Sequence, residues 1–183
     1  MLENGMIRHC AATLAGIKTA NMFSYKFSDT DSLEQELQQV NEKLNEKGVF
    51  VTVLKIQDTK ALIYVYRRSR LESDLNQQEV KNILADCGYK EVEMEECIEQ
   101  LKRRLAGYDC FPHEVGLFLG YPIPDVKGFI EQKGKNYKYS GIWKVYGDEF
   151  ETRKVFRKLE KCAQVYIRLF AGGRSITKLT VAA

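Results

Sequence analysis

The sequence has little of several residue types on which common functions depend. Its 183 residues include three prolines, two histidines and one tryptophan. With 44% hydrophobic and 29% charged residues, the composition is that of an ordinary globular protein, which excludes collagen-like and low-complexity disordered chains. Two histidines also limit the metal-binding and acid–base chemistry that the chain can offer.

Long apolar runs and a targeting segment are absent as well. No stretch approaches about 18 uncharged apolar residues, so we expect no membrane-spanning helix. Residues 1–5 lack the basic start and apolar run of a signal peptide. These two absences predict a cytoplasmic protein.

The five cysteines contain no C-x-x-C pair, which excludes a zinc ribbon and a thioredoxin-type redox motif. In a reducing compartment we expect free thiols. Cys87, Cys97 and Cys162 lie on apolar faces of expected helices and are predicted to be core residues. The chemically interesting thiols are therefore Cys10 and Cys110, each close to one of the two histidines.

Charge is unevenly distributed along the chain. Residues 1–110 carry 15 Lys and Arg against 18 Asp and Glu, whereas residues 111–183 carry 13 against 7. The basic subregion 111–183 would suit an anionic partner. Alternatively, the basic and acidic subregions would attract each other. Scattered solvated charges are the simpler explanation.

Hydrophobic spacing predicts most of the secondary structure. Helical spacing predicts a helix over residues 94–105 and a long helix that begins near residue 148. Two β-rich runs, residues 49–56 and 61–67, predict an antiparallel hairpin, and the first is apolar on both faces, which favours an inner strand. Residues 138–146 are predicted to form a strand.

The start of the chain is ambiguous. Residues 7–14 are compatible with a strand and residues 18–23 with a short helix. In total we expect three to four strands and about seven helices. The predicted fold class is α+β, with a small mixed or antiparallel sheet covered by helices in a single domain over residues 1–183.

Known catalytic and nucleotide-binding motifs are not found. The sequence has no G-x-S-x-G, H-E-x-x-H, EF-hand loop or G-x-G-x-x-G. Residues 16–19, Gly-Ile-Lys-Thr, lack the spacing of a phosphate-binding loop. Lys18 could still meet an anion from a backbone turn.

Several segments together form a specific pattern. They are FPHEVGLFLGYP at 111–122, VKGFI at 126–130, GIWKVYGD at 141–148 and RLFAGGRS at 168–175, preceded by His9-Cys10 and TLAGIK at 13–18. The pattern resembles an uncharacterised family of bacterial, mostly clostridial proteins, domain of unknown function 3793, over about residues 6–181. One departure is Ala12, where proline is usual in the family. The resemblance implies a bacterial, cytoplasmic, single-domain protein and implies no activity.

Both histidines have a cysteine close by, which suggests a metal site. If the two segments meet, His9, Cys10, Cys110 and His113 would supply four ligands to zinc or another soft metal. The spacing matches no common zinc template, and adjacent side chains on a strand point apart. The simpler alternative is two partly buried histidines with ordinary hydrogen bonds.

The same residues would also suit covalent catalysis. Cys10 or Cys110 would act as the nucleophile, and Cys110 lies just before an expected helix that carries His113 and Glu114 in its first turn. The alternative is an inert thiol, with Glu114 placed there because acids favour a helix N-terminus.

A basic aromatic stretch spans residues 133–146. Its lysines attract phosphate, and its tyrosines and tryptophan offer stacking faces, so it would suit nucleic acid or an anionic ring system such as a nucleotide or flavin. Alternatively, the aromatic residues fill the core and the lysines are solvated.

Our preferred interpretation is an accessory protein that binds a small anionic ligand or a metal. The site would be a cleft between residues 9–10 and 111–121, near the basic aromatic stretch. A cysteine-dependent enzyme and a module that binds nucleic acid or a protein partner are the alternatives, and the sequence indicates no cofactor. The candidate ligand-binding residues are His9, Lys18, His113, Tyr121, Lys135, Tyr137, Trp143 and Lys144.

Overall fold

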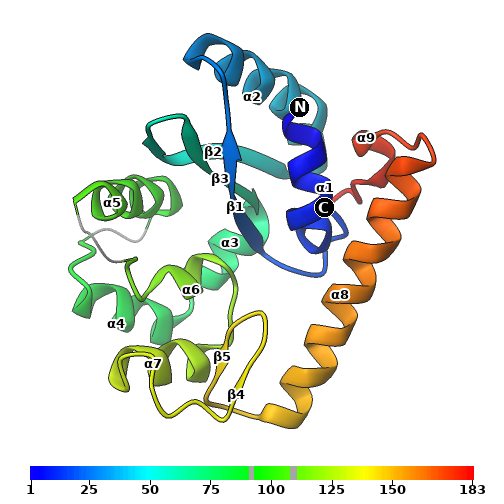
Figure 1. The fold of residues 1–183 in the computed structure, drawn as a ribbon. Coiled ribbons are helices and arrows are strands. Elements are labelled where there is room, and N and C mark those ends of the chain that lie inside the picture. The colour runs from blue at the N-terminus through cyan, green and yellow to red at the C-terminus, as the bar shows by residue number, and fades with distance from the viewer. Residues whose placement is uncertain (91–92, 108–110) are drawn as a thin grey trace. The chain divides into compact units, whose positions relative to one another are not determined.

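The computed structural model describes residues 1–90, 93–107 and 111–183 (Figure 1). They form two compact units: unit 1 is Met1–Arg70 with Lys161–Ala183, and unit 2 is Leu71–Glu160. The described residues contain a three-stranded sheet, a two-stranded sheet and nine α-helices, of which two have only four residues. The predicted α+β class is confirmed. The units do not coincide with the acidic and basic subregions of the sequence.

The sheet of unit 1 is antiparallel. Its strands are β1 (Ala20–Lys26), β2 (Val49–Gln57) and β3 (Lys60–Arg67), in the order β1-β3-β2. Strands β2 and β3 form the predicted hairpin, with Val49 opposite Arg67. The sequence prediction of this hairpin is confirmed.

The central strand is β3, so the prediction that residues 49–56 form an inner strand is wrong. Ile63 and Val65 are buried on one face of β3 and Tyr64 on the other. In β2, by contrast, Phe50 and Thr52 are only half-buried. Strand β2 is therefore an edge strand in which one face is packed more closely than the other, although its sequence is apolar on both.

Residues 7–14, whose sequence is compatible with a strand, belong instead to helix α1 (Leu2–Leu14). Its buried apolar residues follow helical spacing from Leu2 through Met6 and Cys10 to Leu14. Residues 18–23 do not form the short helix with which their sequence is compatible, because from Ala20 onward the backbone pairs with β3. The buried face of α1 already includes Leu2 and Met6. Residues 7–14 taken alone therefore show only part of the helical spacing.

Helix α2 (Thr30–Leu44) begins at Asp29, whose carboxylate accepts a hydrogen bond of 2.8 Å from the Ser32 amide. The 3-10 helix η1 (Asn45–Lys47) follows and ends at Gly48, which has a left-handed φ of 73°. Helices α1 and α2 pack on one face of the sheet (Figure 1). Together they enclose an apolar core whose residues include Leu2, Met6, Leu14, Phe23, Leu33, Leu44, Val51, Ile63 and Val65.

The end of the chain joins this core. Helix α9 (Ile176–Leu179) contributes Ile176 and Leu179 to it. The Arg67 guanidinium is buried and donates hydrogen bonds to the carbonyl oxygens of Thr13, Leu14 and Val181. Arg67 therefore fixes both the end of α1 and the C-terminal tail of unit 1.

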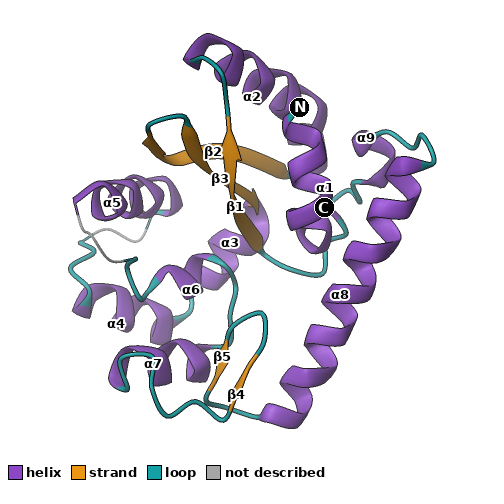
Figure 2. Cartoon of the chain, in the orientation of Figure 1, coloured by secondary structure: helices purple, strands orange, loops and turns teal. Residues whose placement is uncertain are grey.

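Unit 2 is mainly helical (Figure 2). Its elements are the end of α3 (Arg68–Leu75), α4 (Gln78–Asp86), α5 (Met94–Gly107), α6 (Val115–Phe118), α7 (Ile123–Glu131), β4 (Tyr139–Ser140), β5 (Lys144–Val145) and the first part of α8 (Glu149–Ala171). The predicted helix over residues 94–105 is confirmed, and its apolar face is buried. Residues 138–146 do not form one strand: the chain turns after Ser140, which pairs with Lys144 across a short hairpin.

In the part of the chain that the structure describes, no helix combines the length and apolarity needed to cross a membrane.

Candidate functional site

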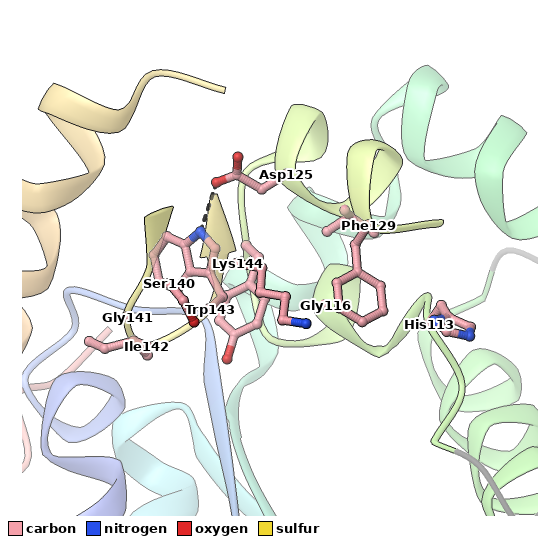
Figure 3. Close-up of a pocket in the computed structure, with 11 residues that line it drawn as sticks. His113, Gly116, Asp125, Phe129, Ser140, Gly141, Ile142, Trp143 and Lys144 are labelled. Carbon is pink, nitrogen blue, oxygen red and sulfur yellow. Dashed lines mark hydrogen bonds between the residues drawn. The ribbon is translucent and has the colours of Figure 1, made fainter. Parts of the chain in front are cut away.

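A pocket of about 350 Å³ lies within unit 2, beside α6, α7 and the β4–β5 hairpin (Figure 3). We call it the aromatic pocket. Four of the predicted ligand-binding residues line it: His113, Tyr121, Trp143 and Lys144. Its lining residues are His113, Gly116, Tyr121, Asp125, Val126, Phe129, Ser140, Gly141, Ile142, Trp143 and Lys144.

Aromatic rings form two sides of the aromatic pocket. On one side, the Tyr121 and Trp143 rings stack with centroids 4.5 Å apart, and Phe156 meets the Trp143 ring edge-on at 4.5 Å. On the other side, the His113 and Phe129 rings lie 5.2 Å apart. Burial raises the pKa of Tyr121 to about 12, so its phenol is neutral at physiological pH. The pocket therefore offers apolar ring faces on both sides.

Asp125 fixes the Trp143 ring. The Trp143 Nε1–H donates a hydrogen bond of 2.7 Å to Asp125 Oδ2, drawn as a dashed line in Figure 3. The amides of Tyr146 and Gly147 each donate a 2.8 Å hydrogen bond to Asp125 Oδ1. Asp125 is only 3% exposed and lies in the first turn of α7, where a carboxylate is favourable. The carboxylate thus attaches the hairpin to α7 and holds the indole in place.

Lys144 brings a positive charge to the aromatic pocket. Its half-buried ammonium donates a hydrogen bond of 2.8 Å to the Gly134 carbonyl. It also lies 4.8 Å from the Tyr137 ring centroid and 5.7 Å from that of Phe129, which are cation–π distances. These three neutral groups position the ammonium.

Gly116 allows α6 and α7 to approach closely beneath the pocket. A Cβ atom at this position would lie 2.8 Å from Val126 Cγ2 and 3.2 Å from the Tyr121 ring. Both distances are too short for packed carbon atoms. The absence of a side chain at Gly116 therefore sets the position of the Tyr121 ring that forms the pocket wall.

The structure places two more predicted residues beside the pocket. Tyr137 is 43% exposed and contacts the Lys144 ammonium. Lys135 is exposed, and its carbonyl accepts a hydrogen bond of 2.9 Å from the Tyr146 hydroxyl. Ligand binding by these residues stays a prediction.

The remaining candidates belong to unit 1. His9 is exposed on α1 and stacks on Phe23 with ring centroids 5.3 Å apart, whereas the neighbouring Cys10 is fully buried in the core. Burial raises the pKa of the Cys10 thiol, which disfavours the thiolate. Lys18 is also buried, donates a hydrogen bond to the Ala20 carbonyl, and has its pKa lowered to about 7 by burial. The predicted cleft between residues 9–10 and 111–121 joins different units and stays a prediction.

The metal prediction finds no support among the described residues. These residues contain no group of three or more His, Cys, Asp or Glu side chains that could hold a metal ion. His9 and Cys10 also face different surroundings, one solvent and the other the core. Cys110 lies outside the described residues, so its roles as ligand and nucleophile stay predictions.

Glu114 has a structural environment. Its side chain is 2% exposed, and its Oε1 accepts hydrogen bonds from Arg104 Nε at 2.5 Å and from the Tyr89 hydroxyl at 3.2 Å. Arg104 also donates a 2.9 Å hydrogen bond to the Cys87 carbonyl. Glu114 therefore helps to tie α5 to the segments on either side of it, and its use as a catalytic base stays a prediction.

Sequence reasoning missed several residues of the pocket. Val126 and Phe129 are apolar residues three positions apart, a helical spacing that is a signal for burial but not for a binding site. Asp125 gave no signal, because its partner Trp143 is 18 positions away. Only the tertiary structure brings these groups together.

Comparison with known proteins leaves the activity open and settles the family. Neither the curated proteins nor the solved structures give a match to this chain. A family model described as "Protein of unknown function (DUF3793)" matches residues 6–180, which is nearly the whole sequence. The chain therefore belongs to the DUF3793 family of proteins of unknown function.

Proposed function

We propose that the protein binds a small organic ligand with a planar ring in the aromatic pocket of unit 2. The observation that carries this proposal is the Tyr121–Trp143 stack, whose indole is held by the buried Asp125 carboxylate. A ring that is already fixed loses little conformational entropy when a ligand stacks on it. Stacked rings contribute about 0.5–1.5 kcal/mol beyond the burial of their area.

The size and lining of the pocket favour a small molecule. Its volume of about 350 Å³ is at the lower end of the range for ligand pockets, roughly 300–1,000 Å³. The lining is dominated by aromatic and aliphatic side chains, with a few polar groups such as Asp125 and Lys144. This combination is typical of sites that orient an apolar ligand with a small number of polar contacts.

The exposure of apolar side chains supports a binding role over a purely structural one. Ile142 at the pocket is 40% exposed, and Trp143 is only half-buried. Tyr137 is 43% exposed beside Lys144. Rings that served only to fill a core would be closed against one another, whereas these leave an accessible space between them.

Isothermal titration calorimetry tests the proposal directly, because it needs no optical signal from the protein or the probe. The protein is titrated with adenosine and with indole-3-carboxamide, which carry a planar ring, and with cyclohexanecarboxamide, which does not. We expect a saturable heat of binding with a planar-ring compound and binding at least about tenfold weaker for the cyclohexane compound.

Two variants separate pocket binding from other effects. Tyr121→Leu removes a stacking face and should weaken binding of the planar compound about tenfold. Phe150→Leu removes an aromatic ring that is 67% exposed and outside the pocket, and should leave binding unchanged. The proposal fails if folded wild-type protein shows no saturable binding of either planar compound up to about 10 mM.

A further inference from the structure

The positive charge of Lys144 is not neutralised by the groups that hold it. Its ammonium has three N–H donors, and one of them donates to the Gly134 carbonyl. Among the described residues, no carboxylate pairs with Lys144. Figure 3 shows the Lys144 nitrogen in the space between the Trp143 and Phe129 side chains. Two N–H donors of the ammonium therefore remain beyond this bond.

The neighbours of Lys144 fix its position without cancelling its charge. The Tyr137 and Phe129 rings attract the ammonium through their quadrupoles, at 4.8 and 5.7 Å from the centroids. A neutral carbonyl and two neutral rings leave a full unit of charge at the pocket. A half-buried lysine in such surroundings attracts an anion more strongly than one on an open surface.

The carboxylate of Asp125, the acid that lines the pocket, is held by other groups. Both oxygens of Asp125 already accept hydrogen bonds, from Trp143 Nε1 and from the Tyr146 and Gly147 amides. Residues 132–147 contain four lysines and no acidic residue. This segment therefore carries a net charge of +4 and attracts anions.

We propose that the ligand of the aromatic pocket is a planar ring that carries an anionic group, and that Lys144 binds this group. This inference rests on the proposed function and adds the chemical class of the ligand. The ring of the ligand stacks against the side of the pocket formed by Tyr121 and Trp143. The anionic group accepts hydrogen bonds from the remaining N–H donors of Lys144. Charge-assisted hydrogen bonds of this kind are shorter and stronger than neutral ones. Phosphate and carboxylate share this chemistry.

Two matched pairs of probes test the requirement for an anion. The first pair is AMP and adenosine, and the second is indole-3-carboxylate and indole-3-carboxamide. Isothermal titration calorimetry measures all four dissociation constants at one fixed ionic strength. We expect the charged member of at least one pair to bind about tenfold more tightly than its neutral partner. Preference within the AMP pair indicates a phosphate, and preference within the indole pair a carboxylate.

Variants assign the preference to Lys144. Lys144→Met keeps the aliphatic stem and removes the charge, so the ratio of the two constants should fall to about one while the neutral probe still binds. Lys144→Arg keeps the charge and should keep most of the preference. Lys133→Met, at an exposed lysine of the same basic stretch that does not line the pocket, is the matched control.

The outcomes distinguish this inference from the proposal on which it rests. Equal affinity of the wild-type protein for both members of each pair overturns the anion requirement and leaves planar-ring binding standing. A tenfold preference that persists in folded Lys144→Met overturns the role of Lys144. If neither neutral probe binds, the proposed function itself fails.

Discussion

Trp143 Nε1 donates a 2.7 Å hydrogen bond to Asp125, which lies 18 positions earlier in the chain and in a different element. The same carboxylate accepts hydrogen bonds from the amides of Tyr146 and Gly147. One buried side chain therefore sets both the orientation of the indole and the attachment of the β4–β5 hairpin to α7. The geometry of the aromatic pocket depends on this one group.

Asp125→Ala should disrupt the aromatic pocket and destabilise unit 2. The substitution leaves three N–H donors without their acceptor, and hydrogen bonds to charged groups contribute about 1.5–3 kcal/mol each. We expect the free energy of unfolding to fall by about 3 kcal/mol or more, since the contributions are not additive. Urea denaturation measures this loss, and Trp143 emission should shift to longer wavelength as the indole becomes solvated.

The matched control for Asp125→Ala is Glu131→Gln, at an exposed acid of the same helix. It should change neither the unfolding free energy nor the emission maximum by a measurable amount. If Asp125→Ala behaves like this control, the carboxylate does not organise the pocket.

Arg67→Met should destabilise unit 1. The Arg67 side chain is 3% exposed and donates to the carbonyl oxygens of Thr13, Leu14 and Val181 at 2.6 to 2.8 Å. Its loss would remove three charge-assisted hydrogen bonds, and the Thr13 and Leu14 carbonyls would keep only their backbone donors, the amides of Gly16 and Val181. We expect a cost of about 3 kcal/mol. Urea denaturation checks the value.

The exposed Arg70 supplies the control for this prediction. Arg70→Met should change stability by no more than about 0.5 kcal/mol. A loss for Arg67→Met that is no larger than this would show that water replaces the guanidinium without cost.

Local patterns predicted the elements whose structure depends on local sequence. The face of α5 was predicted correctly because Met94, Cys97 and Leu101 recur at helical spacing and are buried together. The order of the strands was not predicted. Strand β1 pairs with β3, which is distant in the sequence, and nothing in the local sequence of either strand identifies its partner. An apolar run can therefore identify a strand without showing whether it lies at the centre or the edge.

In the candidate site, too, the sequence indicated some residues, whereas others are recognised only in the folded structure. Tyr121, Trp143 and Lys144 were singled out because aromatic and basic residues suggest stacking and anion binding, and the structure brings them to one pocket. Asp125 is an ordinary acid in the first turn of a helix, and its three hydrogen bonds exist only in the folded chain. Composition thus identified the groups that could contact a ligand and missed the group that positions them.

Stability should rise with pH above neutrality because of Lys18. Burial lowers the pKa of Lys18 to about 7 in the folded protein, below its ordinary value of 10.5. Above pH 7 the unfolded chain therefore binds more protons at this site than the folded chain, so raising the pH favours folding. The slope is at most about 1.4 kcal/mol per pH unit.

The test compares urea denaturation at pH 7 and about pH 8.5, which stays below the range in which Cys10 opposes the effect. Burial raises the pKa of the Cys10 thiol above its ordinary value of 9.0, so stability is lost as the unfolded thiol ionises above that pH. Lys18→Met should reduce the rise between the two pH values, and Lys26→Met, at an exposed lysine, should not. An identical rise in the wild type and Lys18→Met would contradict a buried, titrating Lys18.

Cys10 should resist alkylation in the native protein. Its side chain has no exposed surface, and burial raises the pKa of the thiol, so neither access nor the thiolate form favours reaction. With iodoacetamide at neutral pH, we expect Cys10 to react at least about 100-fold more slowly in the native protein than in urea. Half-buried Cys162 should react sooner, and peptide mass spectrometry measures each site separately. Rapid native labelling of Cys10 would show that its segment opens readily and would restore the nucleophile hypothesis, whereas rapid labelling confined to Cys110 would favour that thiol instead.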